Sequence, residues 1–522
     1  MVLTEILARN ARVYGDSIAL IEREPEEKVR RQITWLQFYR HANAFSRALA
    51  GMGVRKGDRV VHLMMNCLEW LPVYFGILRS GAVAVPLNFR FEAAAIAGCT
   101  NLCQARVMVF GEEFIERISR VKPELDKSVS NYIFSGPDEK CPDFATPLSL
   151  AVEGCGENEP DVSVGPWGGA GIYFTSGTTG EPKGVYLCHR QLEFACYVEN
   201  RHHNQVHSDN FLCIPPLYHT GAKMHWFGNF IVGAPAVILK GVVNPKAILE
   251  AVSQEHVTIV WLLVPWAHDI LVALENNELS LQDYRLEQWR LMHIGAQPVP
   301  PSLIEKWHRF FPGQQYDTNY GLTEATGPGC VHLGTENMHK TGAIGRAGFD
   351  WECMVLDDCG SRVPPETPGE LVVKGPGVME YYWGNAEATA AVLKNGWLHT
   401  GDIVKQDEDG FFWLVDRKKD VIITGGENIF PVEIENYLMT HENILDAAVI
   451  GVPDERLGEI VAAVISPKPG RSLTEEQISN FCNEMPRYKR PRRIFFDSVP
   501  RNPTGKIEKP RLRKKYSHHS DC

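Results

Sequence analysis

The sequence predicts an α/β protein: a large N-terminal domain with parallel α/β layers and a smaller β region, followed by a small, mobile α+β C-terminal domain. Three observations support this. A chain of 522 residues exceeds what one hydrophobic core usually supports. Its composition, 44% hydrophobic and 22% charged, is typical of a globular protein rather than a disordered one. Short apolar runs alternate with amphipathic segments, which is the pattern of parallel strands connected by helices.

The alternation begins near the N-terminus. Thr34 is a suitable N-cap, and the apolar residues after it recur with helical spacing until Gly51 and Gly53. Apolar runs at 59–65 and 82–85 predict buried strands on either side of a helix at 70–78. The same pattern predicts strands at 211–214, 236–239, 259–263 and 290–294. Residues 123–165 are polar, with Pro, Gly and Asp, and predict a surface connection.

The C-terminal region has a pattern of its own. Pro431 suits the first position of a helix that extends to Met439. Strands at 447–452 and 460–465, with a helix beginning near Thr474, complete a small α+β domain.

Charge and cysteine content exclude several classes of protein. A net charge of −11 and a pI near 5.9 give no reason to expect nucleic acid as a partner. The sequence shows no signal peptide, and no run reaches the ~18 uncharged apolar residues of a membrane-spanning helix. The thirteen cysteines are scattered without a Cys-x-x-Cys pair, so they indicate neither a zinc site nor a disulfide framework. We therefore expect a cytoplasmic protein with reduced thiols and no integral membrane association.

The most informative stretch, residues 175–185, reads TSGTTGEPKGV and follows an apolar run. Glycines let successive backbone N–H groups converge on an anion, and hydroxyl groups and a lysine add further donors. It is not a Walker A loop, because Pro182 separates Gly180 from Lys183 and no Ser or Thr follows the lysine. A solvated turn is the alternative. The predicted phosphate-binding residues are Thr175, Ser176, Gly177, Thr178, Thr179, Gly180 and Lys183.

This loop resembles that of the adenylate-forming superfamily, which includes acyl-CoA synthetases, luciferases and peptide-synthetase adenylation domains. Further motifs appear in that family's order over most of the chain, closest in pattern to bacterial short/medium-chain and carnitine/crotonobetaine-type CoA ligases. The resemblance implies ATP, Mg²⁺ and CoA as cofactors or substrates, and it leaves a homodimer open. It also implies an AMP-binding domain at 1–416, a hinge at 417–420 and a C-terminal domain at 421–522.

Residues 215–221, PPLYHTG, follow a predicted strand. A lone histidine in such a place is more often structural than catalytic. The resemblance instead implies that His219 lies near the substrate carboxylate, with Thr220 and Gly221 lining the acyl pocket.

Residues 317–324, DTNYGLTE, carry groups suited to a nucleotide. Tyr320 offers a ring that can stack on adenine. Thr323 offers a hydroxyl group to the phosphate, and Glu324 a hard oxygen of the kind that Mg²⁺ prefers. An exposed turn carboxylate is the alternative for Glu324. The resemblance adds a second metal ligand, Thr175, and further ATP-binding positions at Asn319, Gly321, Gly295, Ala296 and Gln297, although residues 295–298 alone would read as a turn.

Residues 396–402, GWLHTGD, place Asp402 in a predicted loop ahead of a strand at 411–415. Its carboxylate can accept hydrogen bonds from ribose hydroxyls, and Arg417 would add a second contact. Without the family, residues 416–420 read as a charged linker. The resemblance makes Lys419 the hinge residue and assigns Gly425, Gly426 and Glu427 to the CoA tunnel.

Residues 485–515 contain twelve Lys or Arg against two acids, which by itself would indicate a nucleic-acid or membrane patch. The resemblance instead makes Lys506, within 500–506 PRNPTGK, the catalytic lysine. The family commonly has Arg three residues later, where this chain has Lys509.

The resemblance implies an AMP-forming acyl-CoA synthetase. A carboxylate attacks the α-phosphorus of ATP to give acyl-AMP and pyrophosphate, and CoA then displaces AMP. A luciferase-like or carrier-loading enzyme shares the first step, and a non-catalytic nucleotide-binding protein is the other alternative.

The expected substrate is an uncharged short- or medium-chain or cyclic carboxylic acid. Acetate-specific relatives have tryptophan where this chain has Gly321, so we expect room for longer acids. A carnitine- or crotonobetaine-type acid is the alternative, because Trp226, Trp261 and Trp266 flank the predicted pocket. Lys223 argues against it, since a nearby positive charge would repel a betaine.

Overall fold

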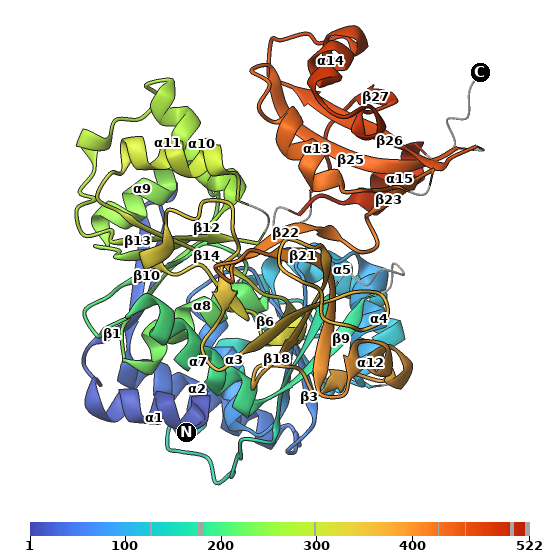
Figure 1. Cartoon of the computed structure of the whole chain (residues 1–522). Coiled ribbons are helices and arrows are strands. Elements are labelled where there is room, and N and C mark those ends of the chain that lie inside the picture. The colour runs from blue at the N-terminus through green and yellow to red at the C-terminus, as the bar shows by residue number, and fades with distance from the viewer. Residues whose placement is uncertain are drawn as a thin grey trace.

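The computed structural model describes residues 1–125, 128–175, 182–296, 299–425, 427–454, 456–501 and 506–516. In this part of the chain, three sheets form the large domain and a fourth forms the C-terminal domain (Figure 1). Strong alternation of apolar runs and helices predicted this α/β class, and the structure confirms it.

The first large sheet leads into the phosphate-binding loop. Its strands are β3 Arg59–Leu63, β4 Val83–Pro86, β5 Val107–Gly111, β6 Asn131–Ser135, β7 Thr146–Pro147, β8 Gly169–Thr175, β9 Lys183–Cys188 and β19 Tyr381–Tyr382. They are arranged in the order β19-β9-β8-β4-β3-β5-β6-β7. The strands from β8 to β7 in this order run parallel, whereas β9 is antiparallel to β8. The chain therefore reverses direction between β8 and β9, the strands that flank the predicted phosphate-binding residues.

The second large sheet carries most of the other predicted motifs. Its strands are β1 Ile18–Glu24, β2 Val29–Thr34, β10 Phe211–Cys213, β11 Ala236–Leu239, β12 Ile259–Leu263, β13 Leu291–Gly295, β14 Gln315–Tyr320, β15 Val331–His332 and β16 Arg346–Ala347. Their order is β16-β15-β14-β13-β12-β10-β11-β1-β2. Because β10, β12, β13 and β14 are parallel neighbours, their carboxyl ends meet at one edge.

Helices form a layer between the two large sheets and cover their outer faces. The central helices are α1 Leu3–Val13, α2 Trp35–Gly51, α3 Trp70–Arg79, α7 His189–His203 and α8 Thr220–Ile231, and their apolar side chains share one core with both sheets. Successive residues of a strand point to opposite faces of the sheet. Val60 of β3 packs into this central core, whereas Val61 packs into the core beneath the outer helices. The outer helices are α4 Ala93–Cys103 and α5 Ile115–Leu125 on one sheet, and α9 Pro245–Gln254, α10 Val264–Glu275 and α11 Pro301–Phe310 on the other.

Thr34 caps α2, as predicted. Its hydroxyl oxygen accepts a hydrogen bond from the backbone N–H of Gln37, and the Gln37 side chain accepts one from the backbone of Thr34. This reciprocal pair fixes where the strand β2 ends and the helix begins.

One predicted surface connection is wrong. Within residues 123–165 the chain forms β6, which lies parallel to β5 in the sheet, as well as β7 and the short helix α6 Leu148–Val152. Ile133 and Phe134 are fully buried. The apolar run is short, and its polar surroundings concealed a central strand.

The smaller β region is the third sheet. It comprises β17 Glu352–Leu356, β18 Gly369–Lys374, β20 Leu393–Lys394, β21 Trp397–Gln406 and β22 Phe412–Arg417, and the helix α12 Ala386–Val392 lies beside it. The strand order is β17-β18-β21-β20, and β22 pairs with β21.

The C-terminal domain stands apart from the large domain in Figure 1, on the side of β21 and β22. Its sheet, β24-β23-β26-β25 with β27 on β26, carries helices on both faces. The bounds are β23 Ile422–Thr424, β24 Glu427–Ile429, β25 Ile444–Asp454, β26 Gly458–Pro467, β27 Arg493–Phe496, α13 Pro431–Leu438, α14 Glu475–Phe481 and α15 Lys509–Tyr516. Pro431 begins α13 and α14 begins next to Thr474, as predicted, and the structure adds that Thr474 is the N-cap of α14.

The structure bears on the membrane-spanning helices and the cysteines of the chain. Within the described ranges, no helix combines the length and the apolar character needed to cross a bilayer. The cysteines of those ranges are all unpaired, and most are buried.

Candidate active site

The two strands that flank the phosphate-binding loop hold its first and last predicted residues together. Thr175 at the end of β8 pairs with Lys183 at the start of β9. The ammonium of Lys183 lies 5.2 Å from the ring centroid of Tyr382. The remaining predicted residues of this loop lie outside the described part of the chain: Ser176, Gly177, Thr178, Thr179 and Gly180.

The predicted magnesium ligand Glu324 is close to this lysine. The hydroxyl of Tyr382 donates a 2.7 Å hydrogen bond to Oε1 of Glu324, so one ring connects the carboxylate with the cation of Lys183. Glu324 lies in a short turn directly after β14 and is half-buried. An oriented carboxylate beside a phosphate-binding loop has the chemistry that Mg²⁺ requires.

The predicted adenosine-binding residues also come together. The hydroxyl of Tyr320, at the end of β14, donates a hydrogen bond to Oδ2 of Asp402. Arg417 lies across from Asp402 in the register of β21 and β22, with its Nε 3.4 Å from Oδ1. The predicted loop position of Asp402 is wrong, since it lies within the strand β21. Strand placement holds this carboxylate more firmly than a loop would.

Lys506 reaches this group from the C-terminal domain. Burial and the positive charge of Arg417 lower the pKa of its ammonium to about 8, although the carboxylates of Asp402 and Glu324 act in the opposite direction. These influences place Lys506 within the electrostatic range of both predicted ATP-binding acids. The lysine is partly buried.

His219, Thr220 and Gly221 form the start of α8. His219 is the N-cap, and its Nδ1 accepts a 3.1 Å hydrogen bond from the backbone N–H of Gly221. Burial, with the positive charge of Lys506, lowers the pKa of His219 to about 3, so its imidazole is neutral. The hydroxyl of Thr220 lies 3.5 Å from that of Thr323. The predicted carboxylate-side and phosphate-side residues therefore meet at this helix terminus.

The interpretation of Gly321 requires correction. A Cβ at this position would lie 2.6 Å from the carbonyl oxygen of Gly327 and 2.8 Å from Cα of Gly329. Backbone rather than open pocket faces the missing side chain, so Gly321 permits close packing of two turns. Its lack of a side chain is no measure of the length of the acyl pocket.

The predicted adenine-side loop is described only in part. Gly295 ends β13, and Ala296 has a left-handed backbone with φ of 68°. A Cβ at Gly295 would lie 3.3 Å from Oδ1 of Asn319, so this loop packs against the end of β14. Gln297 lies outside the described ranges.

Trp261 and His225 form a wall beside Gly221. A Cβ at Gly221 would lie 2.9 Å from the indole of Trp261. That indole stacks on His225, with ring centroids 4.3 Å apart and an interplanar angle of 12°. Trp226 is fully buried against Phe227 and Phe230, and it lies in the same core cluster as Trp261, which is 3% exposed.

Lys223 faces away from that wall. Its ammonium lies 4.4 Å from the ring centroid of Tyr173 and near the rings of Trp70 and Tyr74, and it donates to the carbonyl of Leu217. The ammonium of Lys223 therefore points into the core around Tyr173, although its positive charge still contributes to the lowered pKa of His219. Lys223 and His225 are two residues apart on a helix, which turns them to different faces.

A cluster of buried histidines and acids behind Asn319 was not predicted. We call it the histidine cluster, and it consists of Glu199, His203, His225, His293, Asp317 and His332. Burial disfavours a positive charge on His203, but Glu199 and Asp317 together raise its pKa to about 10. The spacing of Glu199 and His203, four residues apart on α7, was the only signal in the sequence.

The segment after β22 connects the domains. Asp416 is 2% exposed, and its carboxylate accepts hydrogen bonds from the backbone N–H groups of Arg417 at 2.7 Å and Val432 at 2.9 Å. Burial raises the pKa of Asp416 to about 6. Lys419, the predicted hinge residue, follows on the exposed surface. Asp416 therefore joins the end of β22 to the first turn of α13.

Two predicted CoA residues lie at neighbouring strand ends: Gly425 follows β23, and Glu427 begins β24. Gly425 has φ of 58° and is exposed, as is Glu427, whereas Gly426 lies outside the described ranges. The structure places both residues in the C-terminal domain, with Gly425 N–H donating to the carbonyl of Leu457.

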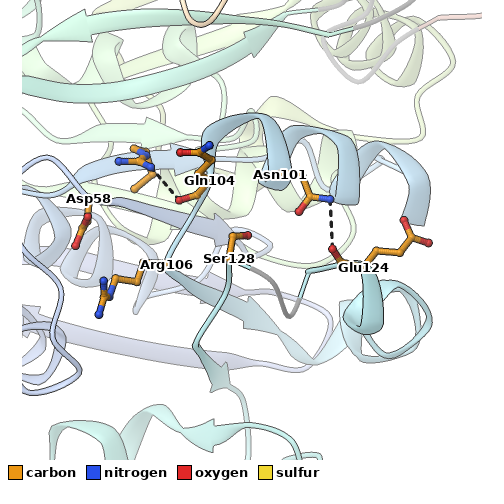
Figure 2. A pocket seen from close by; sticks show the side chains of 7 residues that line it. Asp58, Asn101, Gln104, Arg106, Glu124 and Ser128 are labelled. Carbon is orange, nitrogen blue, oxygen red and sulfur yellow. Dashed lines mark hydrogen bonds between the residues drawn. The ribbon is translucent and has the colours of Figure 1, made fainter.

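A separate depression lies on the outer side of the first large sheet, lined by Asp58, Arg59, Asn101, Gln104, Arg106, Glu124 and Ser128 (Figure 2). Arg59 donates to the carbonyl of Gln104 there, and Asn101 to that of Glu124. No predicted site residue is among them.

Comparison with protein families decides between the alternatives. Residues 7–383 match the family of AMP-binding enzymes, and residues 433–506 match the C-terminal domain of AMP-binding enzymes. The chain belongs to the AMP-binding enzyme family. This AMP-binding enzyme is an AMP-forming acid–CoA ligase that uses ATP, Mg²⁺ and CoA.

Individual relatives agree over nearly the full length. A feruloyl-CoA synthase from Amycolatopsis sp is 33% identical, and the match covers 93% of this chain and 94% of the relative. An indoleacetate–CoA ligase from Aromatoleum aromaticum is 32% identical over 98% of both chains. The crystal structure of an anthranilate CoA ligase in complex with anthranoyl-AMP superposes with a TM-score of 0.89 at 26% identity, covering 99% of this chain and 97% of that one.

Proposed function

We propose that this AMP-binding enzyme activates an uncharged carboxylic acid that carries a ring, and converts it to its CoA thioester. The observation that supports a ring is the wall formed by Trp261 stacked on His225 beside Gly221. A flat substrate can stack against such a surface, which favours it over a flexible chain of the same size. The feruloyl, indoleacetate and anthranilate ligases among the relatives act on ring-bearing acids, as their names state.

In the proposed first half-reaction, Tyr320 stacks on adenine, and Asp402 and Arg417 bind the ribose. The α-phosphate lies between Thr323 and Lys506. Because charge accumulates on the phosphoryl oxygens as the carboxylate attacks, the preorganised ammonium of Lys506 lowers the barrier. Mg²⁺, when bound, neutralises phosphate charge, and Glu324 and Thr175 would hold it.

His219 positions the carboxylate in this scheme rather than accepting a proton. Its pKa of about 3 and its hydrogen bond from the Gly221 N–H leave Nε2 of a neutral ring as the group nearest the acid. A carboxylate attacks as an anion, so this step requires no general base.

In the proposed second half-reaction, the C-terminal domain turns about Lys419, with the domains bounded at 1–416 and 421–522 and the hinge at 417–420. Rotation removes Lys506 and brings Gly425, Gly426 and Glu427 to the thioester site. Sequential use of two faces of one small domain accounts for a catalytic lysine and a CoA-binding turn on the same domain.

A betaine-type acid is the second candidate, since Trp261 could also contact a quaternary ammonium. The orientation of Lys223 toward Tyr173 weakens the repulsion that argued against it, although its charge still reaches His219. His225 covers one face of the indole and so limits contact with a cation and with a ring alike, whereas the feruloyl, indoleacetate and anthranilate ligases among the relatives are named for ring-bearing acids. We therefore retain the uncharged acid as the proposed substrate.

A panel of acids tests the proposal. Benzoate, indoleacetate, cyclohexanecarboxylate, hexanoate, crotonobetaine and carnitine would each be assayed for pyrophosphate release with ATP and for thioester formation with CoA. The ring-bearing acids should exceed hexanoate and the betaines by about tenfold or more in kcat/KM, the factor that ~1.4 kcal/mol gives. Faster turnover of hexanoate or of either betaine would contradict the proposed substrate while leaving the ligase activity intact.

We also propose a cellular compartment and an oligomeric state. We assign the enzyme to the cytoplasm, where ATP and CoA are available, and we keep a homodimer as a hypothesis for sizing experiments.

A further inference from the structure

We propose that three members of the histidine cluster, Glu199, His203 and His293, form a structural binding site for a zinc ion behind the acyl site. The three side chains come from different places in the fold, two from α7 and one from β13. All three are fully buried, and one ligand atom of each lies within 4.8 Å of the others. Two imidazoles and one glutamate are a donor set that zinc uses in proteins, whereas Mg²⁺ prefers oxygen alone.

The one hydrogen bond of His293 leaves its other ring nitrogen available as a metal ligand. Nε2 of His293 lies 3.1 Å from Oδ1 of Asn319, and since that oxygen only accepts, Nε2 is the protonated nitrogen. Nδ1 of His293 then carries a lone pair, and it has no hydrogen-bond partner in the structure. Its ring lies 4.5 Å from that of His203.

His203 has the corresponding arrangement. Its Nε2 donates a 2.8 Å hydrogen bond to Oδ2 of Asp317, and its Nδ1 faces Oε2 of Glu199 at 3.0 Å. In metal sites a ligating histidine commonly donates its other N–H to a carboxylate or a carbonyl oxygen. Asp317 serves His203 in this way, and Asn319 serves His293. Both outer partners are present here before any metal is considered.

The buried carboxylates around the site also favour a bound cation. Among the described residues, the ion-pair partners of Glu199 and Asp317 are all histidines. Two buried carboxylates require compensating positive charge, because an unpaired buried charge is expensive. Oε1 of Glu199 has no hydrogen-bond donor, and Nε2 of His225 lies 3.7 Å from it. A zinc ion would compensate the charge and occupy the lone pairs of all three ligands.

The alternative occupant is a proton. If His203 is an imidazolium between Glu199 and Asp317, the same heavy-atom distances arise without a metal. The two occupants differ in the zinc content of the purified protein, which can be measured without knowing the substrate.

The test measures metal in the full-length enzyme. We expect elemental analysis of desalted wild type to give about one zinc per chain, because three fully buried ligands should retain the ion through purification. His293→Ala and Glu199→Gln should each retain less than about a tenth of an equivalent, since each removes one of three ligands. His293→Cys should retain zinc because a thiolate is also a zinc ligand. His189→Gln is the matched control, a fully buried histidine of the same helix outside the cluster, and it should keep its zinc.

A second measurement uses wild type alone, in case the variants do not fold. Removal of zinc by dipicolinate should lower the melting temperature, and added zinc should restore it. Cobalt added to the stripped enzyme should give the visible absorption bands of a four-coordinate site. Wild type that is folded but binds neither zinc nor cobalt, and whose melting temperature ignores the chelator, would overturn the proposal in favour of the proton.

Discussion

Lys506 is the residue whose loss should separate the two half-reactions. Its ammonium is influenced by Arg417, Asp402 and Glu324, three residues of the proposed ATP site, although it belongs to the C-terminal domain. Removal of one preorganised charged donor from a transition state costs about 10²–10³ in rate, or about 2.7–4 kcal/mol. We expect Lys506→Ala to reduce acyl-adenylate formation by that factor. Thioester formation from synthetic acyl-AMP and CoA should stay within about tenfold of wild type, because the lysine leaves the site before that step.

The lowered pKa of Lys506 also predicts how adenylation depends on pH. Its ordinary value is lowered to about 8, so the ammonium is charged below this pH and is lost as the pH rises through it. The kcat/KM for ATP in adenylation should therefore be flat below about pH 7.5 and fall by about tenfold per unit well above pH 8. Lys506→Arg should remove this fall, whatever its absolute rate, because a guanidinium remains protonated.

The assay is hydroxamate trapping of the acyl-adenylate for the first step and thioester absorbance for the second. Lys514→Ala is the matched control, since Lys514 is an exposed lysine of α15 in the same domain, and it should leave both steps unchanged. Equal losses in both half-reactions for Lys506→Ala would refute the scheme of two domain arrangements. A pH profile that is identical in wild type and Lys506→Arg would refute the assignment of the alkaline limb.

Three further substitutions test the proposed site. Asp402→Asn should raise the KM for ATP by about ten- to a hundredfold, since hydrogen bonds to a charged acceptor contribute about 1.5–3 kcal/mol, and an unchanged KM would remove Asp402 from the ribose site. Gly321→Ala should reduce kcat/KM for all acids in parallel and destabilise the fold by about 1–3 kcal/mol in denaturant titrations, because its Cβ meets the backbone of Gly327. A loss for some acids only would instead support the expectation that Gly321 lines the acyl pocket. Trp261→Ala should lower kcat/KM for ring-bearing acids about two- to tenfold more than for hexanoate, the worth of an aromatic stacking contact, and parallel losses would count against the proposed substrate.

Local patterns predicted most of the fold. The capping residues Thr34 and Thr474 and the helix-initiating Pro431 act where the sequence placed them, because their effect depends on only a few neighbouring residues. The strand β6 was missed since its buried run, at Tyr132 to Phe134, is short and lies in a polar stretch. Its strand character comes from pairing with β5, which is an interaction between segments distant in sequence.

The sequence predicts site residues one by one, but it does not predict the contacts among them. Tyr320 and Asp402 were each predicted for the nucleotide, yet their mutual hydrogen bond depends on how β14 and β21 pack. Gly321 was misinterpreted because the direction of an absent side chain is not written in the sequence. The histidine cluster draws on α7, α8, β13, β14 and β15, and its only local trace is the spacing of Glu199 and His203.

The hydrogen bond between Asp416 and the N–H of Val432 has a consequence for the resting enzyme. At neutral pH, above its pKa of about 6, the Asp416 carboxylate is ionised, and a turn of the C-terminal domain about Lys419 would pull α13 away from it. A hydrogen bond to a charged group is worth about 1.5–3 kcal/mol, which corresponds to a population ratio of roughly ten to more than a hundred. Empty enzyme molecules should therefore spend most of their time with Lys506 already turned inward, so ATP meets a nearly assembled site. The free energy for reorientation is then drawn from the later steps, when pyrophosphate departs and CoA binds.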